Sequence, residues 1–307
     1  MPGVQGAEPV GVVGLGSMGL GMALALRDAG HEVIGHDPHP EACGCLADAG
    51  GRIADTPADL ARQARLVVCV VATAQQVESV LFGEEGVAGV IGDDALFIQC
   101  ATVPPSYIRE LGTRLAGVGV TLLDAPISGG SVKAREGRLS VMASGAPAAF
   151  ERGEPVLNAL AETVHRLGDE VGAGSSVKLV NQLLAGVHIA AAAEAVALGL
   201  RMGLDPEVLY EVITHSAGNS WMFENRVPHI LKGDYSPRSA VNIILKDLGI
   251  VSDTARECTF PAPMASAALQ QFAWTSAAGL GGHDDASVIR YFERVAGVAL
   301  PTAANDD

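Results

Sequence analysis

The sequence predicts an α/β domain with a doubly wound, mostly parallel sheet, followed by an all-α domain. Two observations predict this fold class. In the first half, short apolar runs alternate with helical or loop segments, as in sheets whose strands are joined by crossovers. After Gly168 the pattern changes to long helical segments. We therefore assign residues 1–172 to the first domain. Residues 173–307 form the second, which begins with a long interdomain helix.

The first domain opens with an apolar run and a glycine-rich turn. Val10–Val13 precedes the pattern Gly14-x-Gly16-x-x-Gly19, and a helical pattern follows. Gly14 permits a tight turn, Gly16 lets the backbone approach a pyrophosphate, and Gly19 lets helix and strand pack closely. The free N–H groups at the helix start can bind phosphates. This context predicts a Rossmann-type dinucleotide site, with cofactor contacts from Gly14, Leu15, Gly16, Ser17, Met18 and Gly19.

An acidic residue ends the second predicted strand, Glu32–His36. Asp37 follows Gly19 by 18 residues, close to the ~20 expected for a ribose-binding carboxylate. Such a carboxylate accepts hydrogen bonds from both ribose hydroxyls and repels a 2′-phosphate, so the sequence favours NAD over NADP as the cofactor. The alternative is a capping or turn aspartate before Pro38.

Further strand-like runs occupy Leu66–Val71, Ala95–Cys100, Val120–Leu123 and Leu139–Ala143. In doubly wound sheets the ligand lies outside the carboxyl ends of the strands. Residues that follow these strands are therefore candidates to line the cofactor. These candidates are Val71, Ala72, Gln76, Ala101 and Thr102. The alternative for each of them is an ordinary loop residue without a cofactor contact.

One of these loops, "DAPISGG" (Asp124–Gly130), has a composition suited to a small anion. Ser128 offers a hydroxyl, and Gly129 and Gly130 offer adjacent backbone N–H groups without side-chain bulk. We expect the three residues to bind a substrate carboxylate. A Gly-Gly turn in a surface loop is the alternative.

The second domain starts with an apolar, alanine-rich helix from Val177 to about Met202. Lys178, Asn181 and Gln182 share one face of it by i, i+3 and i+4 spacing, and we expect the Asn181 or Gln182 amide to help bind the substrate carboxylate. The helix dipole and partial burial both disfavour a charged lysine in the first turn, so we expect a lowered pKa suited to general acid–base catalysis. The alternative is a lysine that snorkels at a helix start.

Asp205-Pro206 predicts the start of the next helix, and more helical segments follow at Ser239–Glu257, Pro263–Ala278 and Asp285–Val295. Lys246, in "KDLG", is a second cation in a mostly apolar helix. It is a candidate to lie near the cofactor, and its alternative is an exposed Lys–Asp pair.

The stretch His215–Arg226 is rich in amides, hydroxyls and aromatic rings. Asn219, Ser220 and Trp221 are candidates to line a polyol pocket. Alternatively, the stretch is a loop that Trp221 and Phe223 anchor.

Composition argues against several other classes of function. The net charge is −15 and Lys and Arg form no cluster, so nucleic acid is not an expected partner. The longest apolar run is interrupted by polar residues, and the N-terminus shows no targeting signal, so we expect a cytoplasmic protein without a membrane span. The five cysteines and eight histidines show no metal-ligand spacing, and we predict no metal. Buried, reduced thiols are expected.

Four motifs together resemble the β-hydroxyacid dehydrogenase family, which includes 3-hydroxyisobutyrate dehydrogenase, tartronate semialdehyde reductase and 6-phosphogluconate dehydrogenase. They are "GVVGLGSMG", "DAPISGG", "GAGSSVKLVNQ" and "KDLG", and the resemblance covers almost the whole chain. It implies a Rossmann domain, an all-helical domain, a site between them with Lys178 as catalytic base, and a homo-oligomer (dimer or tetramer). The chain departs from the pattern at Gln182, where many relatives carry asparagine, at Ala72 (proline) and at Ala101 (serine).

The polar stretch Gly218–Arg226 suits a substrate with several hydroxyls. With the resemblance, it implies a four-carbon sugar acid oxidised at its 2-hydroxyl, the hydride passing to NAD. Other substrates of the family, D-glycerate, tartronate semialdehyde or 3-hydroxyisobutyrate, remain open. An imine reductase and a scaffold that binds nucleotide without turnover are further alternatives, and Lys178 together with the Ser128–Gly130 loop argues against both.

Overall fold

The computed structural model describes residues 8–92 and 94–302, so part of the N-terminal stretch examined for targeting signals lies outside it. The chain divides into two compact units, Met1–Lys178 and Leu179–Asp307. The division falls six residues into the long helix that begins at Ala173.

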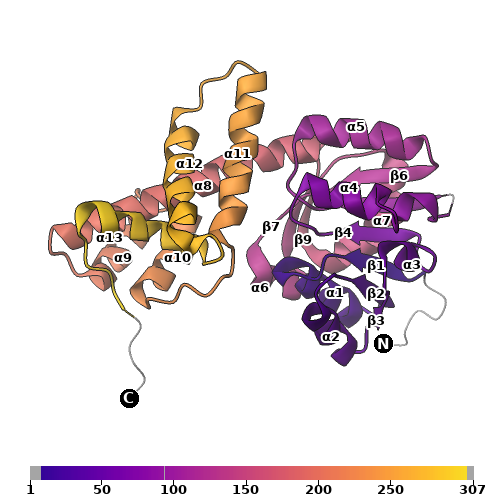
Figure 1. The fold of residues 1–307 in the computed structure, drawn as a ribbon, viewed down its shortest axis with the longest axis horizontal. Helices are drawn as coiled ribbons and strands as arrows, with labels where there is room; N and C mark the ends of the chain where they lie inside the picture. Colours follow the sequence, from indigo (N-terminus) through magenta and orange to yellow (C-terminus); the bar gives the residue numbers. More distant parts are fainter. Residues whose placement is uncertain (1–7, 93, 303–307) are drawn as a thin grey trace. The chain divides into compact units, whose positions relative to one another are not determined.

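A six-stranded parallel sheet forms the centre of the first unit, and its strands run in the order β3-β2-β1-β4-β5-β6 (Figure 1). The order reverses direction between β1 and β4, which is the topological switch point where doubly wound sheets bind ligands. The strands are β1 (Val10–Val13), β2 (Val33–His36), β3 (Arg52–Ile53), β4 (Leu66–Cys69), β5 (Ala95–Gln99) and β6 (Val120–Asp124).

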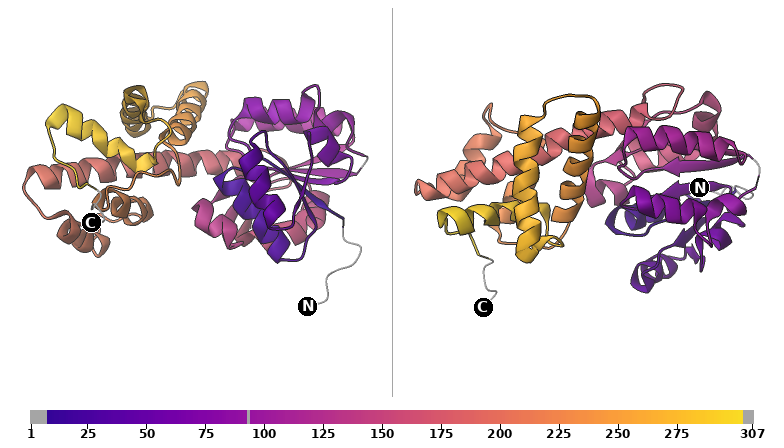
Figure 2. Two further views of the ribbon diagram at one scale, coloured as in Figure 1. Left: turned by 60° about the horizontal axis from the view of Figure 1, so that its bottom comes forward. Right: turned by 45° about the horizontal axis from the view of Figure 1, so that its top comes forward.

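Helices cover both faces of this sheet (Figures 1 and 2). Successive strand residues point to opposite faces, so Val12 joins one hydrophobic core and Val13 the other. The helices of the unit are α1 (Ser17–Asp28), α2 (Pro40–Asp48), α3 (Pro57–Ala61), α4 (Ala74–Phe82), α5 (Pro105–Ala116), α6 (Gly130–Arg135) and α7 (Pro147–Leu160). Helices α1 and α7 pack in the core of Val12, and α4 and α5 in that of Val13.

The predicted strand Leu139–Ala143 forms, but not in the parallel sheet. It is β8 of a separate sheet with the order β7-β8-β9, in which β7 (Ile127–Ser128) is antiparallel and β9 (Ala161–Arg166) parallel to it. The chain reverses direction between β7 and β8, so β8 runs antiparallel to the end of β6 and cannot continue the parallel order. An isolated bridge between Asp124 and Ser144 joins the two sheets. This arrangement places Ser128 next to the carboxyl end of β6.

Cys69 and Cys100 are buried in or next to these strands, as expected, whereas Cys45 and Cys258 are exposed; all five cysteines are free thiols. Burial raises the pKa of the Cys69 thiol to about 12, so this thiol stays protonated at neutral pH.

Helix α8 (Ala173–Arg201) crosses the division, and the rest of the second unit is helical. Its core includes Ile189, Val196, Val227, Leu248 and Phe272. Helices α11 and α12 lie side by side in the views of Figures 1 and 2. The helices are α9 (Pro206–Thr214), α10 (Trp221–Leu231), α11 (Val241–Glu257), α12 (Pro263–Thr275) and α13 (Arg290–Ala296), with a π-helical turn at Ser276–Leu280 and a 3₁₀ helix at Asp285–Ile289.

Helix α8 is the one helix in the described part of the chain that is long and apolar enough to cross a membrane by length and composition. Half of its most apolar window is buried inside the protein. The helix also carries Lys178, Asn181, Gln182 and Glu194. Burial and these polar side chains are typical of a core helix in a globular protein.

Helix α10 is not evident from the sequence, because Pro228 lies inside it and the preceding Gly218 and Asn219 are typical of a loop. Two buried pairs join it to the segment that follows α12. The Arg226 guanidinium donates from Nε to Asp285 Oδ1 at 2.5 Å and from Nη2 to Oδ2 at 3.0 Å. His229 Nδ1 lies 2.8 Å from Asp284 Oδ1. Arg226 and His229 therefore connect α10 to Asp284 and Asp285, at the start of the following 3₁₀ helix.

We predict that Arg226→Met lowers the free energy of unfolding by about 3–5 kcal/mol, because it leaves the fully buried Asp285 carboxylate without its cation. Arg238→Met is the matched control. Arg238 pairs with Asp234 on the surface, where such a pair contributes about 0–1 kcal/mol. Urea unfolding of both variants measures the difference, and equal losses would contradict a special role for the Arg226–Asp285 pair.

Candidate active site

The three glycines of the turn after β1, Gly14, Gly16 and Gly19, differ in the space around them. Gly14 has φ +91°, and a Cβ there would lie 2.9 Å from the Val70 carbonyl oxygen. A Cβ on Gly19 would lie 1.8 Å from the Gly14 carbonyl oxygen, so no larger residue fits. At Gly16 no described protein atom lies within 4 Å of such a Cβ. Packing within the protein requires glycine at positions 14 and 19. Gly16 instead leaves open space in which the pyrophosphate of a dinucleotide could approach the protein backbone.

The start of helix α1 suits a phosphate. Gly16 is its N-cap residue, and among the described residues no side chain caps it. The N–H groups of a first helical turn have no partner within the helix, and the dipole there favours negative charge. Ser17, Met18 and Gly19 provide these groups. The predicted pyrophosphate contacts therefore fit the local geometry.

Asp37 joins the end of β2 to the glycine turn. The Leu15 N–H donates to its Oδ2 at 2.7 Å, and the His39 N–H donates to its Oδ1 at 2.9 Å. His39 Nδ1 also lies 2.8 Å from Oδ1. Burial raises the pKa of Asp37, but these contacts with His39 and Leu15 outweigh burial and hold it below its ordinary value. The carboxylate is thus ionised at neutral pH, as a site that binds ribose hydroxyls and repels a 2′-phosphate requires.

Side-chain amides shape the two loops after β4 and β5. Gln76 Oε1 accepts from the N–H groups of Ala72 and Thr73 at 2.9 and 3.1 Å, in a capping box that begins α4. Gln99 is fully buried and bonds both the N–H and the carbonyl of Ala101. The loops that contain Val71 and Thr102 are therefore ordered at the carboxyl ends of their strands, where cofactor contacts were expected.

The Ser128–Gly130 loop has the backbone that its glycines predict. Ser128 ends β7 opposite Ser140, and Gly129 and Gly130 have φ of +138° and +78°. Residues with a Cβ rarely adopt these angles. Helix α6 then packs on α1, where a Cβ on Gly21 would lie 3.2 Å from that of Ala134. The Ser128–Gly130 loop, which leads into α6, and helix α1 thus belong to one packed structure.

Lys178 is 6% exposed and lies in the second turn of α8 rather than the expected first, because the helix begins at Ala173 and not at Val177. A snorkelling lysine keeps its ammonium group in water. The burial of Lys178 therefore does not fit the alternative of a lysine that snorkels at a helix start. The start of α8 is held by Asp124, the buried first residue of "DAPISGG". Sequence reasoning gave Asp124 no role, although an acidic residue after a strand is a recognisable signal.

Asn181, Gln182 and Lys246 are brought together by Asp247, a second residue that sequence reasoning passed over. Gln182 Nε2 donates to Asp247 Oδ2 at 2.5 Å, and Asn181 Nδ2 donates to Gln182 Oε1 at 2.9 Å. Lys246 Nζ lies 2.8 Å from Asp247 Oδ1. Asp247 is 2% exposed, so the alternative of an exposed Lys–Asp pair is wrong.

Asn219, Ser220 and Trp221 lie at the start of α10. Ser220 Oγ accepts from the Phe223 N–H at 3.1 Å and caps the helix, while Asn219 Nδ2 donates to Glu224 Oε1 at 2.5 Å. Trp221 is 52% exposed. The cap of α10 accounts for a serine at position 220, and the bond to Glu224 accounts for much of the polar character at Asn219. Substrate contacts from these three residues remain a prediction.

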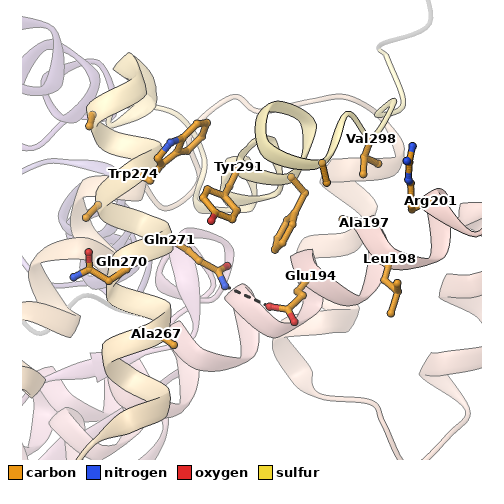
Figure 3. A pocket seen from close by; sticks show the side chains of 14 residues that line it. Glu194, Ala197, Leu198, Arg201, Ala267, Gln270, Gln271, Trp274, Tyr291 and Val298 are labelled. Carbon is orange, nitrogen blue, oxygen red and sulfur yellow. Dashed lines mark hydrogen bonds between the residues drawn. The ribbon is translucent and has the colours of Figure 1, made fainter.

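A pocket of about 890 Å³ lies in the second unit (Figure 3). Apolar atoms form most of its lining, which includes Leu198, Trp274 and Tyr291, and Gln271 Nε2 donates to Glu194 Oε2 at 3.5 Å within it. None of the predicted site residues lines this pocket. Among residues 8–92 and 94–302 no group of three His, Cys, Asp or Glu side chains could hold a metal ion.

Comparison with known proteins agrees with this geometry. Residues 9–168 match the model of the NAD-binding domain of 6-phosphogluconate dehydrogenase, and residues 172–292 match the NAD-binding model of NADP-dependent 3-hydroxyisobutyrate dehydrogenase. L-threonate dehydrogenase of Cupriavidus necator is 55% identical over 96% of this chain and 98% of its own. The Escherichia coli K12 L-threonate dehydrogenase is 49% identical over 96% and 97%.

A crystal structure of 3-hydroxyisobutyrate dehydrogenase from Salmonella typhimurium has a TM-score of 0.89 and 48% identity, covering 93% of this chain and all of that one. Fold and cofactor site define an oxidoreductase that uses NAD. Within that class, the chain belongs to the β-hydroxyacid dehydrogenase family.

We predict that alanine at two glycines of the turn affects two different properties, the stability of the fold and the affinity for NAD. Gly19→Ala destabilises the fold by about 1–3 kcal/mol, since its Cβ overlaps a backbone oxygen. Gly16→Ala changes stability by less than about 0.5 kcal/mol but weakens NAD binding at least about tenfold, because its methyl group occupies the approach of the pyrophosphate. Urea unfolding and calorimetric titration with NAD measure the two effects. Wild-type NAD affinity in Gly16→Ala would argue against this cofactor position.

Proposed function

We propose that the protein oxidises L-threonate at its 2-hydroxyl to 2-dehydro-L-erythronate, with NAD as hydride acceptor. The observation that carries the substrate is the 45–55% identity with L-threonate dehydrogenases over nearly the whole chain. The burial of Lys178 at the start of α8 supports the reaction class. This places the chain in the catabolism of sugar acids.

In this mechanism Lys178 is the general base. Its neutral Nζ takes the proton of the substrate hydroxyl as the adjacent carbon loses hydride, and in the reverse direction it returns that proton. Bound NAD supplies the hydride acceptor. Ser128 and the N–H groups of Gly129 and Gly130 bind the substrate carboxylate, and this contact fixes which hydroxyl faces the lysine.

Hydrogen bonds determine which way the Asn181 and Gln182 amides point their donor and acceptor atoms. A carboxylate only accepts, so Asp247 requires Gln182 to present Nε2 to it and Oε1 to Asn181. Asn181 must then turn its Nδ2 toward Gln182. The chain Asp247–Gln182–Asn181 thus orients an amide on the same helix face as Lys178, where it serves as a contact for a polyhydroxylated acid.

A second specificity has a specific observation in its favour. The Salmonella structure, 48% identical, is a 3-hydroxyisobutyrate dehydrogenase, and that substrate carries a methyl group in place of hydroxyls. D-Glycerate and tartronate semialdehyde are other family substrates. A scaffold without turnover and an imine reductase are less favoured, because Lys178 and the Ser128–Gly130 loop are both present.

We also propose a cytoplasmic homo-oligomer that binds neither nucleic acid nor membranes. Exposed apolar side chains occur at the end of α8 (Leu198), directly after it (Met202) and on α9 (Val208 and Val212), and such surfaces are typical of subunit contacts. The net charge of −15 supports the exclusion of nucleic acid. The proposed preference for NAD over NADP rests on Asp37 and its ionised carboxylate.

A substrate panel tests the proposed reaction. We expect kcat/KM with NAD to be at least about 100-fold higher for L-threonate than for 3-hydroxyisobutyrate, because a site that hydrogen-bonds hydroxyls rejects analogues that lack them. D-Threonate, both erythronates and D-glycerate complete the panel, each with NAD and NADP, while absorbance of the reduced cofactor is followed. Preference for 3-hydroxyisobutyrate would refute the assigned substrate, and no turnover of any acid would support the scaffold alternative.

Lys178→Ala is expected to lower kcat by about 10³–10⁴-fold, since it removes the general base, and to leave the Kd for NAD within about twofold. Lys232→Ala, a change of an exposed lysine after α10, is the control and should behave as wild type. Single-turnover kinetics and calorimetric titration with NAD separate chemistry from binding. A Lys178→Ala enzyme that keeps near wild-type kcat would refute the assigned base.

A further inference from the structure

Asp124 is a fully buried carboxylate at the end of β6, and four donors surround it. The N–H groups of Gly172 and Ser175 donate to its Oδ2 at 3.0 and 2.8 Å. The Ser175 hydroxyl donates to Oδ1 at 2.7 Å, and the Ser144 hydroxyl to Oδ2 at 3.2 Å. Three of these four donors belong to the start of α8 or the residue before it.

The carboxylate acts as a helix cap supplied from a distant part of the chain. The first N–H groups of a helix have no partner within it, and a negative charge beside them is favourable. Asp124 takes two of these backbone donors from 48 and 51 residues away, and the Ser144 hydroxyl accepts a third from Gly174 at 3.0 Å. The start of α8 is thereby bonded to β6 and to the end of β8.

Close packing makes this attachment rigid. A Cβ on Gly174 would lie 2.3 Å from the Met142 carbonyl oxygen and 2.9 Å from that of Asp124, so the helix backbone contacts the strand ends directly. Burial raises the pKa of Asp124, opposed by its hydrogen bonds with Ser175, Gly172 and Ser144. Each oxygen of this fully buried carboxylate already accepts from a donor of its own fold, which suits an anchor rather than a proton acceptor for substrate.

We propose that Asp124 is a positioning residue for Lys178: its carboxylate fixes the start of α8 to the strand that leads into the Ser128–Gly130 loop. Ser175 and Lys178 are three residues apart and share a helix face, so a tilt of this turn displaces the lysine amine. The loop starts four residues after Asp124. One side chain thus holds the base and the carboxylate-binding loop to a common anchor, an inference that rests on the proposed dehydrogenase reaction.

Adjacent serines of one helical turn provide a matched test. Ser175→Ala removes the 2.7 Å bond to Asp124, whereas Ser176→Ala removes a bond of 2.6 Å to the Gly172 carbonyl and leaves Asp124 untouched. We expect Ser175→Ala to lower kcat for L-threonate about tenfold, with KM and the Kd for NAD within about twofold, because misplacement of the base slows chemistry more than binding. Ser176→Ala should match wild type in all three constants.

Asp124→Asn gives the larger change, since an amide cannot accept at both ends, and we expect at least about 100-fold loss of kcat. If that variant does not fold, Ser175→Ala still decides the question. A wild-type kcat in Ser175→Ala would overturn the positioning role. Equal losses of kcat and NAD affinity would overturn it too, because they indicate a general structural defect.

Amide hydrogen exchange distinguishes failure of this inference from failure of the proposed function. Exchange in residues 172–180 should accelerate at least about tenfold in Ser175→Ala and remain unchanged in Ser176→Ala, whatever the substrate. If the wild-type enzyme turns over none of the acids, the proposed reaction fails, and an unchanged exchange rate in Ser175→Ala then also refutes the anchor. Accelerated exchange together with lost kcat supports both.

Discussion

The hydrogen bonds between the buried Asp124 carboxylate and the start of α8 are the interaction on which the candidate site depends. A carboxylate without solvent is costly to bury unless donors surround it. The first turn of a helix supplies such donors, because its N–H groups need an acceptor. The carboxylate and the helix start therefore satisfy each other, and the helix that carries Lys178 is fixed to the strand that leads into the Ser128–Gly130 loop.

Polar side chains that accept backbone N–H groups also order the loops at the carboxyl ends of the parallel strands, where the cofactor is expected. Asp37 accepts the Leu15 N–H, so the residue expected to contact the ribose also shapes the glycine turn expected to hold the pyrophosphate. The Gln76 and Gln99 amides order the two loops at neighbouring strand ends. In each case a polar side chain at the carboxyl end of a parallel strand fixes backbone that can face the cofactor.

Polar residues in the second unit need more than one explanation. The Arg226–Asp285 and His229–Asp284 pairs are buried and join α10 to the segment after α12, so they contribute to the fold whether or not a substrate is near. Asp247 differs, because its contacts orient Gln182 and Asn181 beside Lys178 on α8. A polar motif in a sequence does not by itself distinguish these two roles.

The sequence alone determined the doubly wound sheet, the glycine turn with Asp37, the long helix with Lys178, and the family, because these depend on local periodicity, on glycine's backbone freedom and on spacing along the chain. It did not reveal β9, helix α10 or the separate sheet that contains Leu139–Ala143. Nor did it assign roles to Asp124 and Asp247. Their partners lie 20–51 and 65 residues away, and only tertiary packing decides which donors meet a buried carboxylate.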